Sequence, residues 1–385
     1  MSAATTSEWI AAEGAAIAER AERELAGLVA ISSPSGDANA AEQMCASVSA
    51  LLPPGVEIER PQCSTPAHAP DLLATISGRG RGRLLLLGHL DTVVAHAEHR
   101  PLEDRGERLI GSGAIDMKGG IVLALGVMRA LAARGDTFEE LALLAVNDEE
   151  WRTGRFGHAE RFRDYHACLC FEAGELDGGG ADAVIARRKA AATLRIVAHG
   201  RASHSGASPE RGRSALLALT EAARRVAALN APEGADHMTA VPTVLHSGDA
   251  FNVVPAAGEL VCDLRADRLE AFKPIVAAIP EELDGVRLEA ELVRMWPGMD
   301  TRELVREQLL EAAQALLGRP LVAGERGGAS DASHLAQQLP LTVDGLGPRG
   351  GRAHNPEEFV LRESLRPRAE VALAFAVAAL QSAAI

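Results

Sequence analysis

The sequence predicts an α/β protein in which a mostly parallel sheet, covered by helices on both faces, is interrupted by a ferredoxin-like α+β domain. Short apolar runs alternate with helical segments in the first part of the chain, which is typical of a parallel sheet. Beyond residue 184 the order becomes β-α-β-β-α-β, and after residue 294 the α/β pattern returns. We therefore expect a discontinuous domain at 1–184 and 295–385 and an inserted domain at 185–294. Two domains suit a chain of 385 residues.

The elements of the first domain follow from apolar runs and helical spacing. The runs expected to form buried strands are residues 83–91, 141–146 and 166–174. The expected helices are residues 117–135, 301–318 and 363–382. Gly135 is a suitable C-cap for the first of these helices. The first 30 residues have dispersed acids, which predicts an amphipathic helix and not a signal peptide.

The inserted domain contains four strand-like segments and two helical segments. The expected strands are residues 191–200, 237–248, 258–267 and 286–296. The expected helices are residues 208–230 and 269–279. Pro209 lies near the first turn of the earlier helix, where proline is tolerated, whereas Pro274 would bend the later helix. A unit with this order of elements folds by itself, so we expect a separate domain.

Composition and charge argue against several classes of protein. A hydrophobic fraction of 47% is ordinary for a globular chain and argues against disorder. The net charge of −14 argues against nucleic acid or an anionic membrane as the main partner, and no apolar run is long enough to span a bilayer. The five cysteines are odd in number and scattered, which favours a reducing compartment over a disulfide framework. We expect a cytoplasmic protein.

Acidic residues and a histidine are concentrated where the expected strands and one helix begin or end. They are His89, Asp91, Asp116, Asp148, Glu149, Glu150 and Glu172. Open parallel sheets bind ligands outside the carboxyl ends of their strands, so these side chains can meet in one crevice. Crowded carboxylates repel one another, and one or two divalent cations would relieve that repulsion. Zinc accepts imidazole nitrogen and carboxylate oxygen, and a carboxylate can span two metals.

Each of these residues has a simpler explanation when it is taken alone. A histidine at a strand end is usually structural, successive acids often form a solvated turn, and an aspartate before a helix is most often a cap. The positions of all seven at element boundaries favour the metal site. His89 and Asp91 are two residues apart on an extended segment, so they face the same side and Asp91 can hold the imidazole ring.

Five motifs extend this pattern over most of the chain: "GHLDTV", "GSGAIDMKGG", "NDEE", "FEAGE" and "GGRAHNPEEF". They resemble the successive signatures of the zinc aminoacylase and carboxypeptidase family, which includes glutamate carboxypeptidase, acetylornithine deacetylase and succinyl-diaminopimelate desuccinylase. Further matches are "GRASHSGASPERGRSAL", "NVVPAAGEL", "CDLRAD" and "GGASDA", and the glutamate carboxypeptidase branch looks closest. The resemblance implies a catalytic domain of α/β type and an inserted dimerisation domain.

The resemblance also implies a role for the residues at the strand ends. The implied ligands are His89 and Glu172 for one zinc ion, Glu150 and His354 for a second, and Asp116 between them. Glu149 would be the general base, and Asp91 would orient His89. Cobalt or manganese would suit the same donors. Members of the family often carry a cis peptide after the bridging aspartate, which makes Asp116–Met117 the candidate in this chain.

Residues of the inserted domain are implied to act near the substrate. In the family, the residue corresponding to His204 enters the active site of the partner subunit and helps to bind the oxyanion. This implies a homodimer formed through the inserted domain. Asn252 and Arg265 also match family positions near the substrate. Arg265 has an alternative role, in which it pairs with Asp263 or Asp267.

Two further segments are candidates for binding a substrate carboxylate. Arg294 ends the last strand of the inserted domain, and its guanidinium can fork onto a carboxylate. Its alternative role is that of a hinge residue paired with Asp300. Gly328 and Ser330 precede a helix, and backbone amides at the start of a helix bind anions well. A helix cap provided by Ser330 or Asp331 is the alternative there.

We therefore expect a dinuclear zinc hydrolase that cleaves an amide next to a free carboxylate. The expected substrate is an N-acyl amino acid, or a short peptide with an acidic or apolar C-terminal residue. The alternatives are a biosynthetic deacylase acting on acetylornithine or succinyl-diaminopimelate, and a silent homologue that only binds a ligand. The chain departs from the usual pattern after the acids. There, "DEEWRTGRFG" makes the loop longer and places Trp151 or Arg152 where it could shape the pocket.

Overall fold

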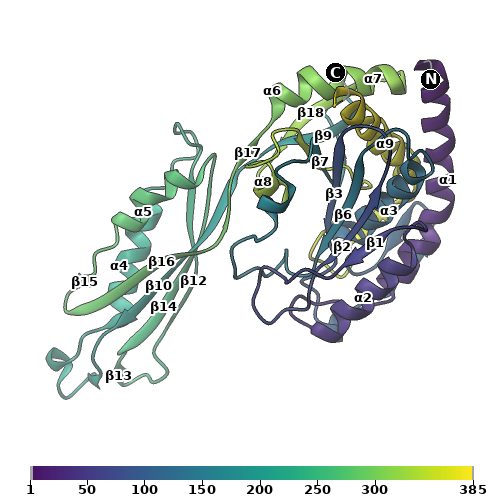
Figure 1. The fold of residues 1–385 in the computed structure, drawn as a ribbon. Coiled ribbons are helices and arrows are strands. Elements are labelled where there is room, and N and C mark those ends of the chain that lie inside the picture. The colour runs from purple at the N-terminus through teal and green to yellow at the C-terminus, as the bar shows by residue number, and fades with distance from the viewer. Residues whose placement is uncertain (1–2, 384–385) are drawn as a thin grey trace. The chain divides into compact units, whose positions relative to one another are not determined.

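The computed structural model describes residues 3–383 and contains two compact units (Figure 1). The first unit runs to Arg187 and continues at Asp300–Arg326 and from Ser330 onward. The second unit comprises Arg188–Met299 and Gly327–Ala329. The insertion thus begins at 188 and not at 185, and ends at 299 and not at 294. It begins later because strand β9 (Asp182–Arg188) pairs with β18 (Leu321–Arg326), a strand of the first unit.

The first unit contains a six-stranded sheet with the order β1-β2-β6-β3-β7-β19. Its strands are β1 (Glu57–Glu59), β2 (Leu72–Ser77), β3 (Arg83–His89), β6 (Glu140–Val146), β7 (Ala167–Cys170) and β19 (Thr342–Val343). The last four are parallel to one another, which confirms the expected α/β sheet. β1 and β2 add an antiparallel edge that was not predicted. β1 is three exposed residues long and is therefore too short to show a periodic pattern.

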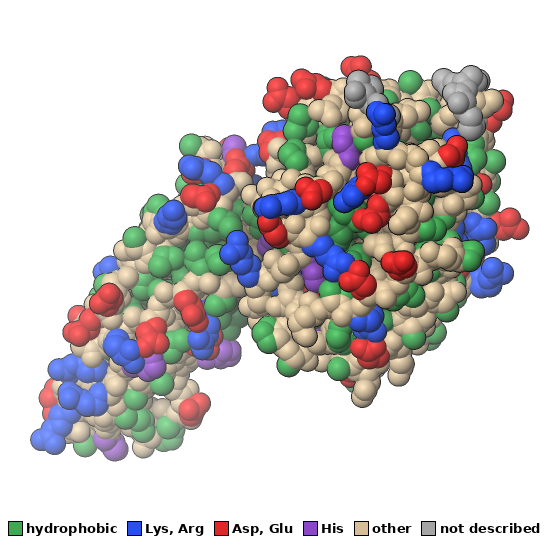
Figure 2. Space-filling model, in the orientation of Figure 1, with side chains coloured by type: hydrophobic (Ala, Val, Ile, Leu, Met, Phe, Trp, Pro, Cys, Tyr) green, Lys and Arg blue, Asp and Glu red, His purple; other side chains and the backbone are tan. Residues whose placement is uncertain are grey.

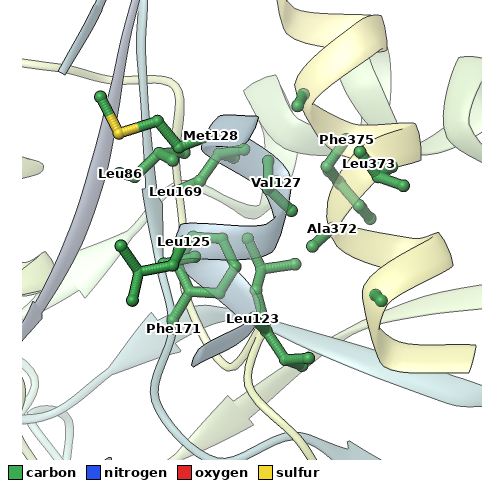
Figure 3. Close-up of a cluster of buried hydrophobic side chains, with 14 of the residues drawn as sticks. Leu86, Leu123, Leu125, Val127, Met128, Leu169, Phe171, Ala372, Leu373 and Phe375 are labelled. Atoms are coloured by element: carbon green, nitrogen blue, oxygen red, sulfur yellow. The ribbon is translucent and has the colours of Figure 1, made fainter. Parts of the chain in front are cut away.

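Both faces of this sheet are buried. Leu86 of β3 belongs to the core formed with α3 (Gly119–Ala132) and α9 (Leu365–Ser382), whereas Leu87 is buried on the opposite face. Figure 3 shows this core, in which Leu86 and Phe171 lie beside apolar side chains of the two helices. A strand covered on both sides needs apolar residues throughout, which explains the continuous apolar runs in the sequence.

The remaining elements of the first unit surround the sheet. Its other helices are α1 (Ala3–Val29), α2 (Ala38–Ala50), α6 (Arg302–Val305), α7 (Glu311–Leu317) and α8 (Ala332–Leu335). Its other strands are β4 (Glu103–Arg105), β5 (Arg108–Ile110), β8 (Glu175–Leu176), β20 (Gly350–Gly351) and β21 (Phe359–Leu361), and β17 (Met299–Asp300) joins the units. α1, the helix expected at the N-terminus, packs against α3 and α9, and α8 packs against β7 and β19.

The second unit is an antiparallel sheet with the order β12-β14-β10-β16-β15. Its strands are β10 (Ala190–His199), β12 (Thr239–Ser247), β14 (Ala257–Ala266), β15 (Glu282–Leu283) and β16 (Val286–Trp296), with a separate pair β11 (Ser203–His204) and β13 (Val253–Val254). α4 (Ala215–Ala228) and α5 (Lys273–Ala277) share a core with alternate residues of β10 such as Leu194 and Ile196. The predicted ferredoxin-like order is confirmed.

Two helices of the second unit differ in their starts from what we predicted. Pro209 lies in a separate 3-10 turn, and α4 begins only at Ala215, because Ser214 caps its first turn. Pro274 lies in the first turn of α5 and does not bend it, since a separate 3-10 turn at Leu269–Phe272 precedes that helix.

One helix end in the first unit was also predicted wrongly. α3 ends at Ala132, so Gly135 is not its C-cap. The carbonyl of Gly135 instead accepts a hydrogen bond from the Arg79 amide at 2.6 Å. The residue therefore belongs to the turn that connects the helix to β6.

The cysteines and the helices agree with two expectations from composition. All five cysteines are free and buried, which fits the absence of a disulfide framework. Within residues 3–383, no helix has the length and apolar composition needed to cross a membrane.

His334 predicts a loss of stability in acid. The residue is half-buried on α8 and stacks on Phe156, with ring centroids 5.0 Å apart. Burial lowers the pKa of His334 to about 4, compared with about 6.5 in an unfolded chain. The folded state therefore binds fewer protons between these values. The free energy of unfolding should fall as the pH drops from about 6.5 to about 4, by about 3 kcal/mol from this group.

Urea denaturation at a series of pH values would check this contribution. His334→Gln should flatten the acid side of the stability curve relative to the wild type. The exposed His246 provides a control, because His246→Gln should leave the curve unchanged. Parallel acid slopes for wild type and His334→Gln would contradict the assignment.

Candidate metal centre

The end of β3 carries the first histidine of the site. His89 is the last residue of the strand and is 1% exposed. Its Nδ1 lies 3.0 Å from the backbone oxygen of Asp91 and 3.4 Å from a carboxylate oxygen of the same residue. Its Nε2 faces Asp116 Oδ1 at 3.1 Å and Glu172 Oε1 at 3.7 Å. The ring is therefore oriented by Asp91 on one side and presents its other nitrogen to two carboxylates.

Asp116 is the residue shared by the two halves of the site. It lies in a turn before α3 with extended backbone angles, and the Asp116–Met117 peptide is cis, as the resemblance implied. Its Oδ1 faces His89, and its Oδ2 lies 3.1 Å from His354 Nε2. His354 Nε2 also lies 3.2 Å from Glu150 Oε2. One carboxylate thus extends an oxygen to each of two imidazoles.

Among residues 3–383, three groups of side chains have donor atoms close enough together to hold a metal ion. They are His89 with Asp116 and Glu172, Asp116 with Glu150 and His354, and Cys63 with Asp71 and Asp148. The first two groups share Asp116 and contain all five residues expected to be ligands. His89 is buried, whereas the His354 side chain is 54% exposed, so the centre opens towards solvent on the side of His354.

The separations between donors fit zinc. Zinc binds nitrogen and oxygen at about 2.0–2.2 Å, so two ligand atoms of one tetrahedral shell lie about 3.3 Å apart. The three closest donor pairs around Asp116 are 3.1, 3.1 and 3.2 Å apart, and the His89–Glu172 pair is 3.7 Å apart. Zinc binds imidazole nitrogen and carboxylate oxygen, whereas sites made only of oxygen donors suit magnesium, calcium or manganese. The residues present therefore suit two zinc ions with a bridging carboxylate.

Neighbouring charges and burial shift the pKa values of several residues of the site. Hydrogen bonds to Asp116 and Glu150 raise the pKa of His354 to about 10. Burial lowers the pKa of His89, but its hydrogen bonds to Asp116 and Asp91 outweigh burial and raise it well above the usual value. Burial raises the pKa of Glu149 well above that of an ordinary glutamate, and the charge of His89 partly opposes this. The crowded acids thus require positive charge beside them.

The three acids at the end of β6 have different surroundings. Asp148 is fully buried and accepts hydrogen bonds from Thr65 N at 2.8 Å and Thr65 Oγ1 at 2.7 Å, and it belongs to neither donor group around Asp116. The backbone amides of Glu149 and Glu150 bond to the two carboxylate oxygens of Asp91, at 3.2 and 3.1 Å. Asp91 therefore orients both the His89 ring and the turn that carries the acids.

Glu358 is a residue of the site that the sequence reasoning missed. Its buried carboxylate accepts hydrogen bonds from the backbone amides of Gly113, Ile115 and Asp116, at 3.1, 2.7 and 2.8 Å. It follows His354 by four residues, so it ties the loop carrying that histidine to the turn carrying Asp116. Gly113 has φ +71°, which other residues rarely adopt. The signal in the sequence was an acid inside "NPEEF", directly before the apolar strand β21.

In the second unit, His204 and Asn252 lie side by side. β11 and β13 pair His204 with Val253, and the amide of Ser205 donates to the backbone oxygen of Asn252 at 3.0 Å. The Nδ1 of His204 accepts hydrogen bonds from the amides of Gly206 and Ala207, both at 3.1 Å. The proton of the neutral ring is therefore on Nε2, which is left as a donor on an exposed side chain.

The two arginines of the second unit differ in how they are held. Arg265 forms a forked pair with Asp263 on its own strand, with the closest contact at 3.0 Å, which is the alternative role considered for it. Arg294 lies over the ring of Trp296 at 5.8 Å and has a left-handed backbone, with φ +51°. Asp300, the alternative partner for Arg294, pairs with Arg302 at 2.7 Å.

Gly328 and Ser330 are already engaged in hydrogen bonds within their own units. The backbone oxygen of Gly328 accepts from Arg188 at 2.8 Å. The buried hydroxyl of Ser330 donates to Asp344 at 2.6 Å, and it belongs to neither of the donor groups around Asp116. Asp331 is the N-cap residue of α8, but no side-chain hydrogen bond caps that helix.

The chain is similar to a known protein family and to several known proteins. The model of the family described as "Peptidase family M20/M25/M40" matches residues 85–378. Carboxypeptidase G2 of Pseudomonas sp. (strain RS-16) is 28% identical over 316 residues, which cover 77% of this chain and 74% of that protein. Succinyl-diaminopimelate desuccinylase of Methylobacterium sp. (strain 4-46) is 29% identical over 344 residues, which cover 80% of this chain and 84% of that protein.

A solved structure supports the fold. The crystal structure of aminopeptidase PepT from Bacillus cereus ATCC 10987 has a TM-score of 0.71 and 19% sequence identity. The alignment covers 94% of this chain and 98% of PepT. At this identity the likeness concerns the fold and not the substrate.

Replacing Glu358 should weaken zinc binding, although Glu358 is not one of the proposed ligands. Glu358→Gln replaces one carboxylate oxygen by an NH2 group, which cannot accept from the backbone amides around Asp116. The turn should loosen, and the affinity for zinc should fall by about 10–100-fold, as is usual when a group that supports a ligand is lost. Isothermal titration calorimetry of the metal-free protein with zinc would measure this change.

The neighbouring Glu357 offers a matched control. It pairs with Arg100 at 3.0 Å and its side chain is 40% exposed. Glu357→Gln should leave zinc affinity unchanged. Equal affinities in the two variants would show that Glu358 does not support the site.

Proposed function

The chain belongs to peptidase family M20/M25/M40, a family of metal-dependent hydrolases, and we propose that it is a dinuclear zinc hydrolase cleaving the amide of an N-acyl amino acid or short peptide. The family resemblance seen in the sequence is thereby confirmed. The observation that carries the proposal is the pair of donor groups joined by Asp116. In the proposed substrate, a free carboxylate lies next to the scissile amide.

In this proposal the protein's own residues bind ions, orient the turn and move one proton. His89, Glu172, Glu150, His354 and Asp116 would hold two zinc ions. The ions would supply a lowered pKa for a bound water and polarisation of the amide carbonyl. Glu149 accepts the proton of the attacking water and delivers it to the leaving amine. Asp91 holds Glu149 in place through the backbone amide.

The residues present argue against a catalytically inactive homologue. A homologue that only binds a ligand needs no general base, yet Glu149 accompanies all five donor residues. The His354 side chain is 54% exposed, so a substrate can approach this side of the site from solvent. A biosynthetic deacylase remains the second candidate, because the desuccinylase relative matches this chain at an identity similar to that of carboxypeptidase G2.

The second unit is proposed to contribute the remaining contacts. His204 from a second copy would donate from Nε2 to the oxyanion, since its Nδ1 is occupied by two backbone amides. Asn252 lies beside it and would contact the substrate. Arg294 is proposed to bind the substrate carboxylate through its forked guanidinium.

A homodimer through the second unit is supported by exposed apolar side chains at one edge of its sheet. β12 is an edge strand, so one side of its backbone is available for pairing. Val241 and Val244 of β12 are 47% and 41% exposed, and Leu217 of α4 is 70% exposed. Figure 2 shows apolar side chains among charged ones on the visible face of this unit. We propose that two copies pair along β12 and α4 about a twofold axis.

Substitutions at Leu217 and Val244 would test the proposed dimer interface. Leu217→Glu with Val244→Lys should weaken self-association by about 100-fold or more, because charges would be buried in the interface. Analytical ultracentrifugation would measure the change. Turnover should fall with dissociation if His204 serves the other copy. Met295→Lys is the control, since Met295 is similarly exposed but lies on β16. A monomeric wild type would refute the interface.

Glu149 tests the reaction. Glu149→Gln should retain zinc and lose turnover by about 100–10,000-fold, since the amide cannot accept the proton of water. The assay is a panel of N-acyl amino acids and dipeptides, with acetylornithine and succinyl-diaminopimelate included, run with and without added zinc. Glu160→Gln, an exposed acid farther along the same loop, should remain active.

The panel also separates the candidate functions. Cleavage of acidic or apolar C-terminal substrates supports the proposed hydrolase, and preference for one biosynthetic intermediate supports the second candidate. A zinc-loaded wild type that cleaves no member would favour the silent homologue. Full activity of Glu149→Gln would remove Glu149 from its role as base.

A further inference from the structure

A second buried polar cluster lies next to the turn that carries the acids. It contains Cys63, Asp71 and Asp148, whose donor atoms are close enough together to suggest a metal site. Both carboxylates already have positive or hydrogen-bonding partners: Arg152 contacts Asp148, and His158 contacts Asp71 at 2.7 Å. Burial raises the pKa of the Cys63 thiol, which keeps it protonated. This cluster is therefore a structural network, and Arg152 holds one of its carboxylates, Asp148.

Arg152 is a fully buried guanidinium held by two carboxylates. It contacts Asp148 Oδ1 through Nη2 at 2.7 Å and through Nε at 3.2 Å. It contacts Asp331 Oδ2 through Nη2 at 2.8 Å, and its Nη1 faces the other oxygen of Asp331. The guanidinium lies over the ring of Phe156 at 4.9 Å, and Phe156 stacks on His334. Its orientation is thus fixed by carboxylates along its edges and by Phe156 over one face.

The first partner, Asp148, belongs to the turn that presents the proposed base. Thr65 holds the second oxygen of Asp148 through its amide and hydroxyl, so Asp148 is fixed between Thr65 and Arg152. The amides of Glu149 and Glu150 are held by Asp91. The turn is therefore attached at two points, one through its backbone and one through the Asp148 side chain.

The second partner, Asp331, belongs to a distant segment of the chain. Asp331 precedes α8 (Ala332–Leu335), and its neighbour Ser330 donates to Asp344 at 2.6 Å. Arg152 thus connects the turn at the end of β6 to the segment that begins α8. It also places positive charge between two buried carboxylates that would otherwise repel each other.

We propose that Arg152 is a positioning residue for catalysis: by forking between Asp148 and Asp331 it fixes the turn that presents Glu149. The proposal rests on the hydrolase function proposed above. The hydrogen bonds of the Arg152 guanidinium go to Asp148 and Asp331 and not to the five donor residues, so its proposed effect is on the position of the turn.

The experiment compares Arg152→Ala, Arg152→Lys and Arg161→Ala in the zinc-loaded dimer. Arg161 is an exposed arginine near the end of the same loop, paired with Glu59, so its variant is the matched control. Arg152→Ala should lower kcat by about 100-fold, because a small displacement of a catalytic group has effects of that size. KM should stay at the wild-type value, and kcat is compared at saturating zinc because the turn also carries Glu150, a proposed ligand. Arg152→Lys retains the charge without the fork and should also lose kcat.

Two readouts separate positioning from a general loss of structure. Guanidinium ion, added below denaturing concentrations, should restore part of the turnover of Arg152→Ala, whereas methylammonium should not, because only guanidinium reproduces the planar fork. Hydrogen exchange should show faster exchange of the Glu149 and Glu150 amides in both Arg152 variants than in Arg161→Ala. If Arg152→Ala is too unstable to purify, Arg152→Lys provides both measurements.

The outcomes distinguish this proposal from the one on which it rests. Wild-type kcat in Arg152→Lys, or unchanged exchange of the two amides in the Arg152 variants, would overturn the positioning role. Hydrogen exchange requires no turnover, so it decides the role of Arg152 for any substrate. Absence of turnover in the wild type, together with the expected exchange, would count against the hydrolase and leave the attachment of the turn supported.

Discussion

The structure around the site depends on one constraint, which is that buried carboxylates must have positive charge or hydrogen-bond donors beside them. Asp116 shows this most clearly, because each of its oxygens faces an imidazole, one from His89 and one from His354. Without such partners a carboxylate at this depth would be strongly destabilised. The same constraint explains why a chain can place three acids in succession at the end of an apolar strand.

The three acids of that turn satisfy the constraint in different ways. Asp148 pairs with Arg152 and Thr65, away from the donor groups. Glu150 faces His354 and Asp116, where zinc is proposed to bind. Glu149 lies between them with its amide on Asp91, and burial raises its pKa. Sequence neighbours therefore perform separate tasks because the chain turns between them.

Two further carboxylates act on the backbone and not on a metal. Asp91 accepts the amides of Glu149 and Glu150, and Glu358 accepts three amides around Asp116. Backbone amides held by a rigid carboxylate fix the direction of the side chains they carry, which is what a site with several converging donors requires. In this respect the surrounding residues are as important to the geometry as the donors themselves.

The sequence by itself determined the fold class and the residues of the centre. Short continuous apolar runs favour strands covered on both faces, and polar residues at the carboxyl ends of parallel strands meet at one edge of the sheet. This reasoning brought His89, Asp116, Glu150 and Glu172 to one crevice, whereas His354 and the ligand roles were implied by the family resemblance. The order β-α-β-β-α-β likewise predicted the second unit.

Tertiary structure alone decided which partner each charged group takes. The pairing of Arg152 with Asp331 joins residues 179 apart in the sequence, and Glu358 binds amides more than 240 residues away. No local pattern encodes such pairs, because they depend on how loops pack and not on periodicity. The helix starts at Ala215 and Lys273 were missed for a related reason, since capping and short 3-10 turns override the apolar period locally. The local sequence pattern predicts which residues are buried. The partners of the buried charged residues depend on which distant segments pack together.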